Sequence, residues 1–208
     1  MTTSQALIAF AFAAGLLTLT PGLDTALVIR TAAAEGPRRA AGAALGIGLG
    51  CLIWGAAAAF GAGALLTASE TAYAILKWAG ALYLACTGLR MIVKPRDRFE
   101  PGEMRAVDAG PIAALRRGLL TNLLNPKVGI FYVSFLPQFI PPGVDPGRFG
   151  LLLAGIHVAE GLAWFAVLIA ATVPIAGLLR VGAVVRWLDR VTGGVFVAFG
   201  LRLALERR

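Results

Sequence analysis

Four ionisable side chains stand within strongly apolar stretches of this sequence, and their types suit the handling of a zwitterion and a proton. Asp24 and Lys127 offer a carboxylate and an ammonium, and His157 and Glu160 lie three positions apart in one further apolar run. Charges at membrane depth mark substrate and ion pathways. Residues three apart share a helix face, so the histidine and the glutamate are candidates for a proton relay. A mutually satisfied polar pair is an equal alternative for these two.

Asp24 and Lys127 each follow a proline that interrupts an apolar run. The residues of the two breaks are Thr20, Pro21 and Gly22 in the first and Asn125 and Pro126 in the second. The residue before a proline is pushed out of the helical region. Threonine and asparagine are good N-caps for a helix that begins with proline. We therefore expect each break to start a half-helix whose free N–H groups attract a carboxylate.

The two charges sit differently in these half-helices. In a first turn, Asp24 suits the positive end of the helix dipole, whereas Lys127 opposes it. Lys127 therefore needs another partner: a carboxylate ligand, Asp24 itself, or a path to water. We predict that the two breaks face each other and bind a substrate. In the alternative, the prolines only kink two helices, and the two charges only neutralise each other.

The composition is that of a membrane protein. The chain has 208 residues, of which 58% are hydrophobic and 14% charged, and its mean hydropathy is +0.79. Soluble domains carry about a quarter charged residues. The net charge of +8 comes from basic residues in short connections between apolar runs. Basic residues in such connections set the orientation of a membrane protein. We therefore expect a lipid bilayer around the chain and no nucleic-acid partner, and we expect neither a metal site nor a cofactor.

Six apolar runs are visible, at about 5–31, 40–66, 71–93, 112–140, 149–173 and 191–205. The breaks fall in the first and the fourth. The pattern predicts an all-α membrane protein with six transmembrane helices, arranged as two inverted three-helix repeats in which helices 1 and 4 are broken. Interrupted segments at corresponding places in two halves point to a transporter site. The sixth run is short and follows an amphipathic stretch, Leu178–Arg190, so five spans plus an interfacial helix is the alternative.

Basic residues set the expected orientation. They concentrate in the first, third and fifth connections, which are therefore cytoplasmic, with the N-terminus outside. The chain then forms one transporter domain, 1–208, with repeat one at about 5–93, a cytoplasmic linker at about 94–111, and repeat two at about 112–205. Each proline lies nine residues from a basic residue, Arg30 or Arg117. At about 1.5 Å per residue, both breaks fall near the midplane of a core of about 30 Å.

The second run is rich in glycine and alanine. Gly46 and Gly50 form one G-x-x-x-G pattern, and small residues let helices approach closely in lipid. We interpret the pattern as packing inside one chain, with dimerisation into a homo-oligomer as the alternative.

The chain resembles the lysine exporter (LysE/RhtB-type) family of amino-acid efflux proteins over nearly its whole length. The segments that carry the resemblance are Thr20-Pro21-Gly22 with Asp24, Gly46–Gly50, Lys77–Leu84 with Gly88, Thr121–Lys127, Phe135–Phe139, and Gly193-Gly194 to Gly200–Leu203. The family usually has a second proline after Thr-Pro-Gly, and Leu23 stands there in this chain. The resemblance implies export of an amino acid or derivative across a bacterial-type inner membrane, by antiport driven by the proton gradient.

Rival functions need features that this sequence lacks. A thiol–disulfide electron carrier needs a cysteine pair at the breaks, and Cys51 and Cys86 lie elsewhere, inside apolar runs where we expect packed thiols. An ion channel shows rings of like charge or filter segments. An enzyme needs a convergent catalytic set. The main alternative is therefore a transporter of another small metabolite or ion.

Overall fold

The computed structural model describes residues 1–68, 70–95, 111–171 and 181–205, and within these ranges the ordered elements are all helical. Two described helical segments, Pro37–Gly61 and Pro146–Ala170, are each long and apolar enough to cross a membrane. Two further helix pairs pass the same test if each pair is taken as one bent span, with bends of 52° and 57°. The bends lie at the two predicted breaks, so the interruptions foreseen in the first and fourth runs are confirmed.

The helices follow the apolar runs in order. They are α1 (Thr3–Leu19), α2 (Leu23–Glu35), α3 (Pro37–Ala68), α4 (Glu70–Val93), α5 (Pro111–Leu123), α6 (Pro126–Ile130), the π-helix η1 (Phe131–Phe135), the 3₁₀ helix η2 (Leu136–Phe139), α7 (Pro146–Ala170) and α9 (Gly182–Leu205). The apolar sixth run and most of the amphipathic stretch before it form one helix, α9. A separate interfacial helix is therefore not found in the described part of that stretch. The expected linker at about 94–111 lies almost entirely outside the described residues.

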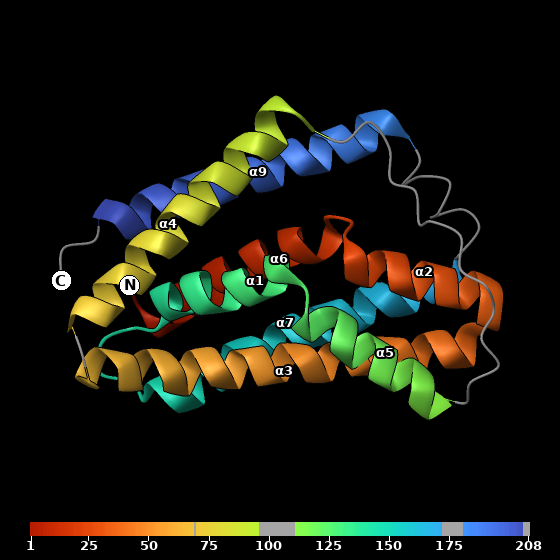
Figure 1. The fold of residues 1–208 in the computed structure, drawn as a ribbon, viewed down its shortest axis with the longest axis horizontal. Coiled ribbons are helices and arrows are strands. Elements are labelled where there is room, and N and C mark those ends of the chain that lie inside the picture. Colours follow the sequence, from red (N-terminus) through yellow and green to blue (C-terminus); the bar gives the residue numbers. More distant parts are fainter. Residues whose placement is uncertain (69, 96–110, 172–180, 206–208) are drawn as a thin grey trace.

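Long helices alternate in direction along the molecule (Figure 1). α1, α4 and α7 begin at one end, and α3, α5 and α9 begin at the other. α3 packs along α5 and α7, while α4 and α9 pack against each other as an antiparallel pair. At the end where α2 terminates, Arg117 of α5 holds both carboxylate oxygens of Glu35 at 2.7 and 2.8 Å. The two halves of the sequence are thus interleaved.

Glycines set the closest approach between α3 and α5. A Cβ at Gly46 would overlap the carbonyl of Leu115, and a Cβ at Gly118 would overlap that of Ala43. Only a residue without a side chain lets two backbones come this near. The G-x-x-x-G pattern at Gly46 and Gly50 therefore packs against α5 of the same chain, as the internal interpretation predicts.

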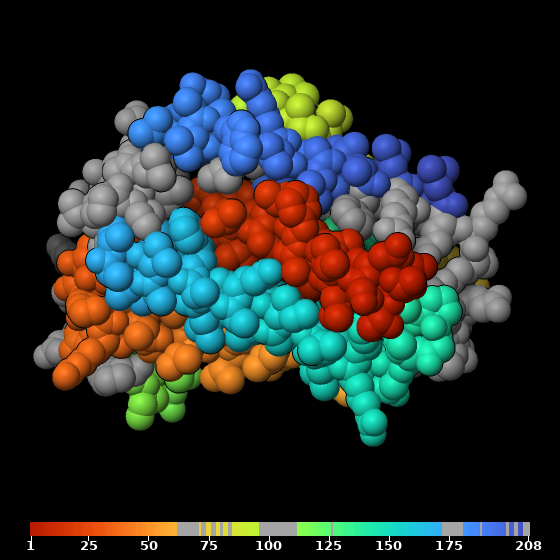
Figure 2. All heavy atoms as spheres, turned by 180° about the vertical axis from the view of Figure 1, so that it is seen from behind, coloured from red at the N-terminus to blue at the C-terminus, as the bar shows by residue number. Residues whose placement is uncertain are grey.

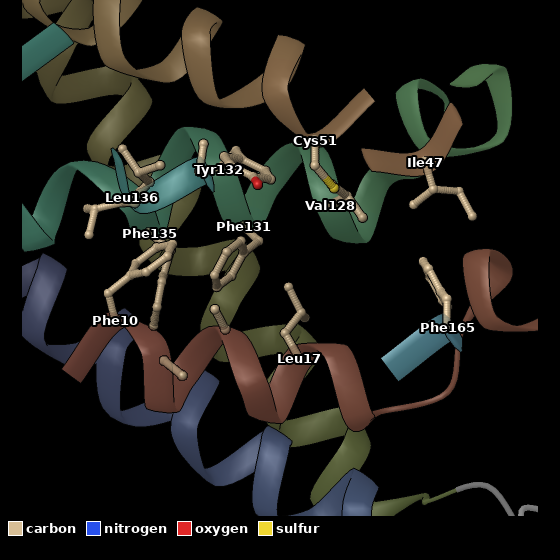
Figure 3. Close-up of a cluster of buried hydrophobic side chains, with 14 of the residues drawn as sticks. Phe10, Leu17, Ile47, Cys51, Val128, Phe131, Tyr132, Phe135, Leu136 and Phe165 are labelled. Carbon is tan, nitrogen blue, oxygen red and sulfur yellow. The ribbon is translucent and has the colours of Figure 1, made fainter. Parts of the chain in front are cut away.

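An aromatic cluster fixes the segment after the second break (Figure 3). Phe131 and Phe135 stack with their ring centroids 4.8 Å apart, and Phe10 of α1 lies 5.9 Å from Phe131 and 5.4 Å from Phe139. All four rings are almost completely buried. Aromatic pairs at such spacings stabilise a core beyond their buried area. Seen from behind, α1 is a band between α7 and α9 (Figure 2).

Candidate functional site

At the first break, Thr20 caps the C-terminus of α1 and not the N-terminus of α2. Thr20 is the C-cap of α1, and both its N–H and its hydroxyl donate to the carbonyl of Leu16, at 3.0 and 2.8 Å. The N-cap of α2 is Gly22, with extended backbone and no side-chain cap. The prediction that Thr20 is an N-cap was therefore wrong. Thr20 and Gly22 both adopt extended backbone around Pro21, so α2 begins only at Leu23.

The second break follows the prediction. Asn125 is the N-cap of α6, its side-chain oxygen accepts from the N–H of Lys127 at 3.1 Å, and Pro126 stands at the start of the helix. Asn125 is buried. The two breaks therefore differ: one half-helix begins with a side-chain cap and the other begins without one.

Lys127 binds the end of α1. Its Nζ donates to the carbonyl of Thr20 at 3.0 Å and to that of Leu17 at 3.4 Å. Leu17 is four residues before Pro21, which has no N–H, so its carbonyl has lost its ordinary helical donor. The ammonium supplies that donor and lies at the negative end of the α1 dipole. This partner was missed by the sequence reasoning, which considered only a ligand, Asp24 or water.

Asp24 is held by a residue that the sequence reasoning did not single out. Asn122 of α5 is fully buried, and its Nδ2 donates to Asp24 Oδ2 at 2.9 Å and to Cys51 Sγ at 3.4 Å. Asp24 Oδ1 and Asn122 Oδ1 are both buried without a hydrogen-bond partner. Unsatisfied buried acceptors are costly, and these two suit a group rich in N–H donors. The sequence signals for Asn122 were an amide inside an apolar run and a place in the segment Thr121–Lys127 that carries the family resemblance.

His157 and Glu160 have different surroundings. His157 is buried, and a hydrogen bond of 2.9 Å joins its Nδ1 to the hydroxyl of Tyr132 on η1. Glu160 Oε2 is buried without a hydrogen-bond partner. The structure thus gives the histidine a partner from another element, and the two residues share a helix face without a described bond between them.

A central cavity of about 60 Å³ lies where the breaks meet. Of the predicted site residues, those that line it are Thr20, Gly22, Asp24, Asn125, Lys127 and His157. Glu160 is not among them, and Pro21 lines a neighbouring cavity instead. This volume holds a few water molecules, so a larger ligand requires the cavity to widen.

A second cavity of about 570 Å³ lies on the other side of the first break. We call it the basic cavity, because it is lined by Arg30 of α2, Arg90 of α4 and Lys94, which directly follows α4. The residues common to both cavities are Thr20, Gly22, Asn125 and Lys127. The residues of the two breaks therefore lie between a small cavity and a large one.

Thiol and metal chemistry find no support in the described residues. Cys51 and Cys86 are both free, and Cys86 is exposed, so the expectation of a packed thiol was right for Cys51 alone. The searched part of the chain contains no cluster of three or more metal-ligating side chains.

The family model and the relatives each match most of the chain. The family model described as LysE type translocator matches residues 16–207. An uncharacterised membrane protein of Vibrio cholerae is 30% identical over 96% of this chain and 97% of its own length. The threonine efflux protein of Escherichia coli is 28% identical over 91% and 92%. The leucine efflux protein of Klebsiella pneumoniae is 29% identical over 89% and 88%. No solved structure matches the chain significantly.

Proposed function

Because the chain belongs to the LysE type translocator family, whose members are transporters and not enzymes, we propose that it exports an amino acid or an amino-acid derivative. The relatives named as threonine and leucine efflux proteins support this substrate class. The proposed location is a bacterial-type inner membrane, with the N-terminus outside. The proposed mechanism is antiport driven by protons.

One observation carries the proposal: a carboxylate and an ammonium line the same cavity at the meeting point of two broken helices. The substrate ammonium would bind Asp24 Oδ1, a buried acceptor without a hydrogen-bond partner on a residue that lines this cavity. The substrate carboxylate would bind Lys127 and the start of α2, which has no side-chain cap. Such a helix start favours an anion. The arrangement thus complements both ends of a zwitterion.

Counterflow in proteoliposomes tests the substrate class. Vesicles loaded with each of the twenty amino acids, homoserine or homoserine lactone should accumulate the same labelled compound for at least one of them. A complete absence of counterflow across this panel would favour the alternative, a transporter of another small metabolite or ion.

A double variant tests whether Asp24 and Lys127 hold the substrate or only each other. Hydrogen bonds to charged groups contribute about 1.5–3 kcal/mol, so Asp24→Asn or Lys127→Met should each weaken substrate binding about tenfold to a hundredfold. If the two charges only neutralise each other, removing both leaves no unpaired charge, and transport should return. If they bind the substrate, the double variant should be at least as inactive as either single one. Recovered transport would contradict the site.

Reciprocal contacts support the proposed inverted repeats. A Cβ at Gly88 would lie 2.5 Å from the Gly193 carbonyl, and a Cβ at Gly193 would lie 2.6 Å from the Gly88 carbonyl. A two-fold axis between α4 and α9 produces such mutual contacts. Gly88 and Gly193 are 105 positions apart, as are Pro21 and Pro126.

The middle helices show the same reciprocity. Gly55 of α3 lies against Ala154 of α7, and Gly150 of α7 lies against Ala59 of α3. A shift of 95 positions converts the first contact into the second. With equivalent helices running in opposite directions (Figure 1), these contacts support six spans in two inverted halves, each with a broken first helix.

Two ionisable residues of α7, His157 and Glu160, support the proposed proton coupling. Glu160 has a buried oxygen without a partner, and His157 lines the central cavity. Intramembrane carboxylates and histidines form proton relays in pumps and transporters. We therefore assign Glu160 and His157 to proton movement and keep the two breaks for the substrate.

A further inference from the structure

The residues that line the basic cavity carry a net positive charge, whereas Asp24 and Lys127 balance each other in the central cavity. Arg90 lies in the last turn of α4, Lys94 directly follows the helix, and both are exposed, while Arg30 on α2 is half-buried. Asp189 of α9 is the only carboxylate among the residues that line this cavity in the described part of the chain. The residues of the two breaks, including Lys127, form the inner end of the basic cavity. The cavity therefore leads from a cationic mouth to the candidate substrate site.

We propose that the basic cavity is the route by which substrate reaches the site from the cytoplasm, and that its cations select substrates by their carboxylate and disfavour cationic amino acids. This inference rests on the proposed function and orientation. A cavity lined by one sign of charge focuses the field and raises the local concentration of the opposite charge. Zwitterionic and anionic amino acids present a carboxylate to this field, whereas lysine and arginine add a second positive charge that it repels.

Size and position also favour this route. About 570 Å³ lies within the usual range of small-molecule sites, roughly 300–1,000 Å³. The central cavity, at about 60 Å³, is too small to admit substrate without rearrangement. Substrate that enters the basic cavity meets Thr20, Gly22 and Lys127, which also line the central cavity.

Topology alone does not explain where these cations lie. Arg38 near the start of α3 and Arg116 near the start of α5 are also exposed and lie close to the expected cytoplasmic ends of their helices, yet they line neither cavity. Arg30 of α2, Arg90 of α4 and Lys94 just after α4 all belong to the first half of the chain, and they line the same cavity. Arg38 and Arg116 therefore provide a matched control that removes equal charge from the same side.

The test compares two double variants in inside-out membrane vesicles, where the cytoplasmic face is accessible. Uptake of labelled L-threonine and L-leucine is measured with L-lysine as competitor. Arg90→Gln/Lys94→Gln should raise the KM about fivefold at low ionic strength, reduce the dependence of KM on salt, and strengthen competition by lysine. Arg38→Gln/Arg116→Gln should leave all three within about twofold of the unaltered protein. Arg90→Lys, which keeps the charge, should retain the original KM.

Three results would overturn the inference. The first is an unchanged KM in Arg90→Gln/Lys94→Gln while the unaltered protein transports threonine or leucine. The second is an equal rise in KM in both double variants at equal amounts of protein in the membrane. That result would mean that Arg90 and Lys94 serve only to orient the protein in the membrane. The third is absence of amino-acid counterflow in the unaltered protein over the full panel, which would remove the proposed function and this inference with it.

Discussion

Replacing Lys127 by methionine tests the bond between the two broken helices most directly. The substitution keeps an unbranched side chain of similar length and removes the ammonium. The bond to the Thr20 carbonyl, at 3.0 Å, has ordinary length, while the bond to the Leu17 carbonyl, at 3.4 Å, is long. Counting one bond in full and one in part, we expect a loss of about 2–4 kcal/mol in the free energy of unfolding.

A loss of that size is measurable as a shift in melting temperature. For a chain of this length, 1 kcal/mol corresponds to about 2–4 °C, so Lys127→Met should melt roughly 5–15 °C lower in detergent. Pro21→Ala offers a specific rescue, because an alanine at position 21 restores the N–H that the Leu17 carbonyl lacks. Pro21→Ala/Lys127→Met should therefore recover part of the lost stability. It should not recover counterflow, since the partner of the substrate carboxylate is still missing.

Lys94→Met removes a lysine that is exposed, and its melting temperature should stay within about 2 °C of the unaltered protein. If Lys127→Met melts at the same temperature as the unaltered protein, the ammonium does not stabilise the end of α1. If the rescued double variant transports substrate normally, Lys127 acts only as a structural donor.

Three further predictions concern packing, proton coupling and orientation. Gly118→Ala should lower the melting temperature, because overpacking costs about 1–3 kcal/mol. As a control, Gly155→Ala should be neutral or stabilising, because Gly155 has open space around it. Equal effects of the two substitutions on the melting temperature would contradict the α3–α5 contact. Glu160→Gln should abolish export driven by a proton gradient and largely preserve substrate exchange; parallel loss of both would indicate packing. In a variant lacking Cys51 and Cys86, a cysteine at Glu100, which lies outside the described residues, should resist an impermeant reagent in intact cells. Labelling from outside would reverse the orientation.

The sequence was sufficient to locate the breaks, and it placed Asp24 and Lys127 together because proline and charge are rare inside apolar runs. It was insufficient for the partners of these residues. The Lys127 bond depends on a donor that Pro21 lacks and on how α1 and α6 cross, and the crossing is a tertiary property. Thr20 was assigned to the wrong helix because a threonine hydroxyl caps a following helix or bonds back to the preceding turn with equal ease.

The surroundings of His157 and Asn122 were beyond reach for a related reason. A helical period correctly puts His157 and Glu160 on one face, but the partner of His157, Tyr132, comes from a π-helical turn. A π-helical turn changes the helical period locally, and amino-acid composition does not predict where such a turn occurs. Asn122 donates to Asp24 only because α2, α3 and α5 pack together, and this packing cannot be read from the sequence of α5 alone.

The shift of 105 positions that relates the two breaks to each other, and α4 to α9, has a consequence for re-uptake of exported substrate. If the halves exchange conformations, the positions equivalent to Arg30 and Arg90 on the outer side are Phe135 and Val195, both apolar. The exit would then lack the positive field of the entrance, and the KM for uptake from outside should exceed the KM from inside in right-side-out and inside-out vesicles from the same membranes. Equal values would argue against the exchange. Such rectification slows reabsorption of exported substrate, while the driving gradient alone sets the final concentration ratio.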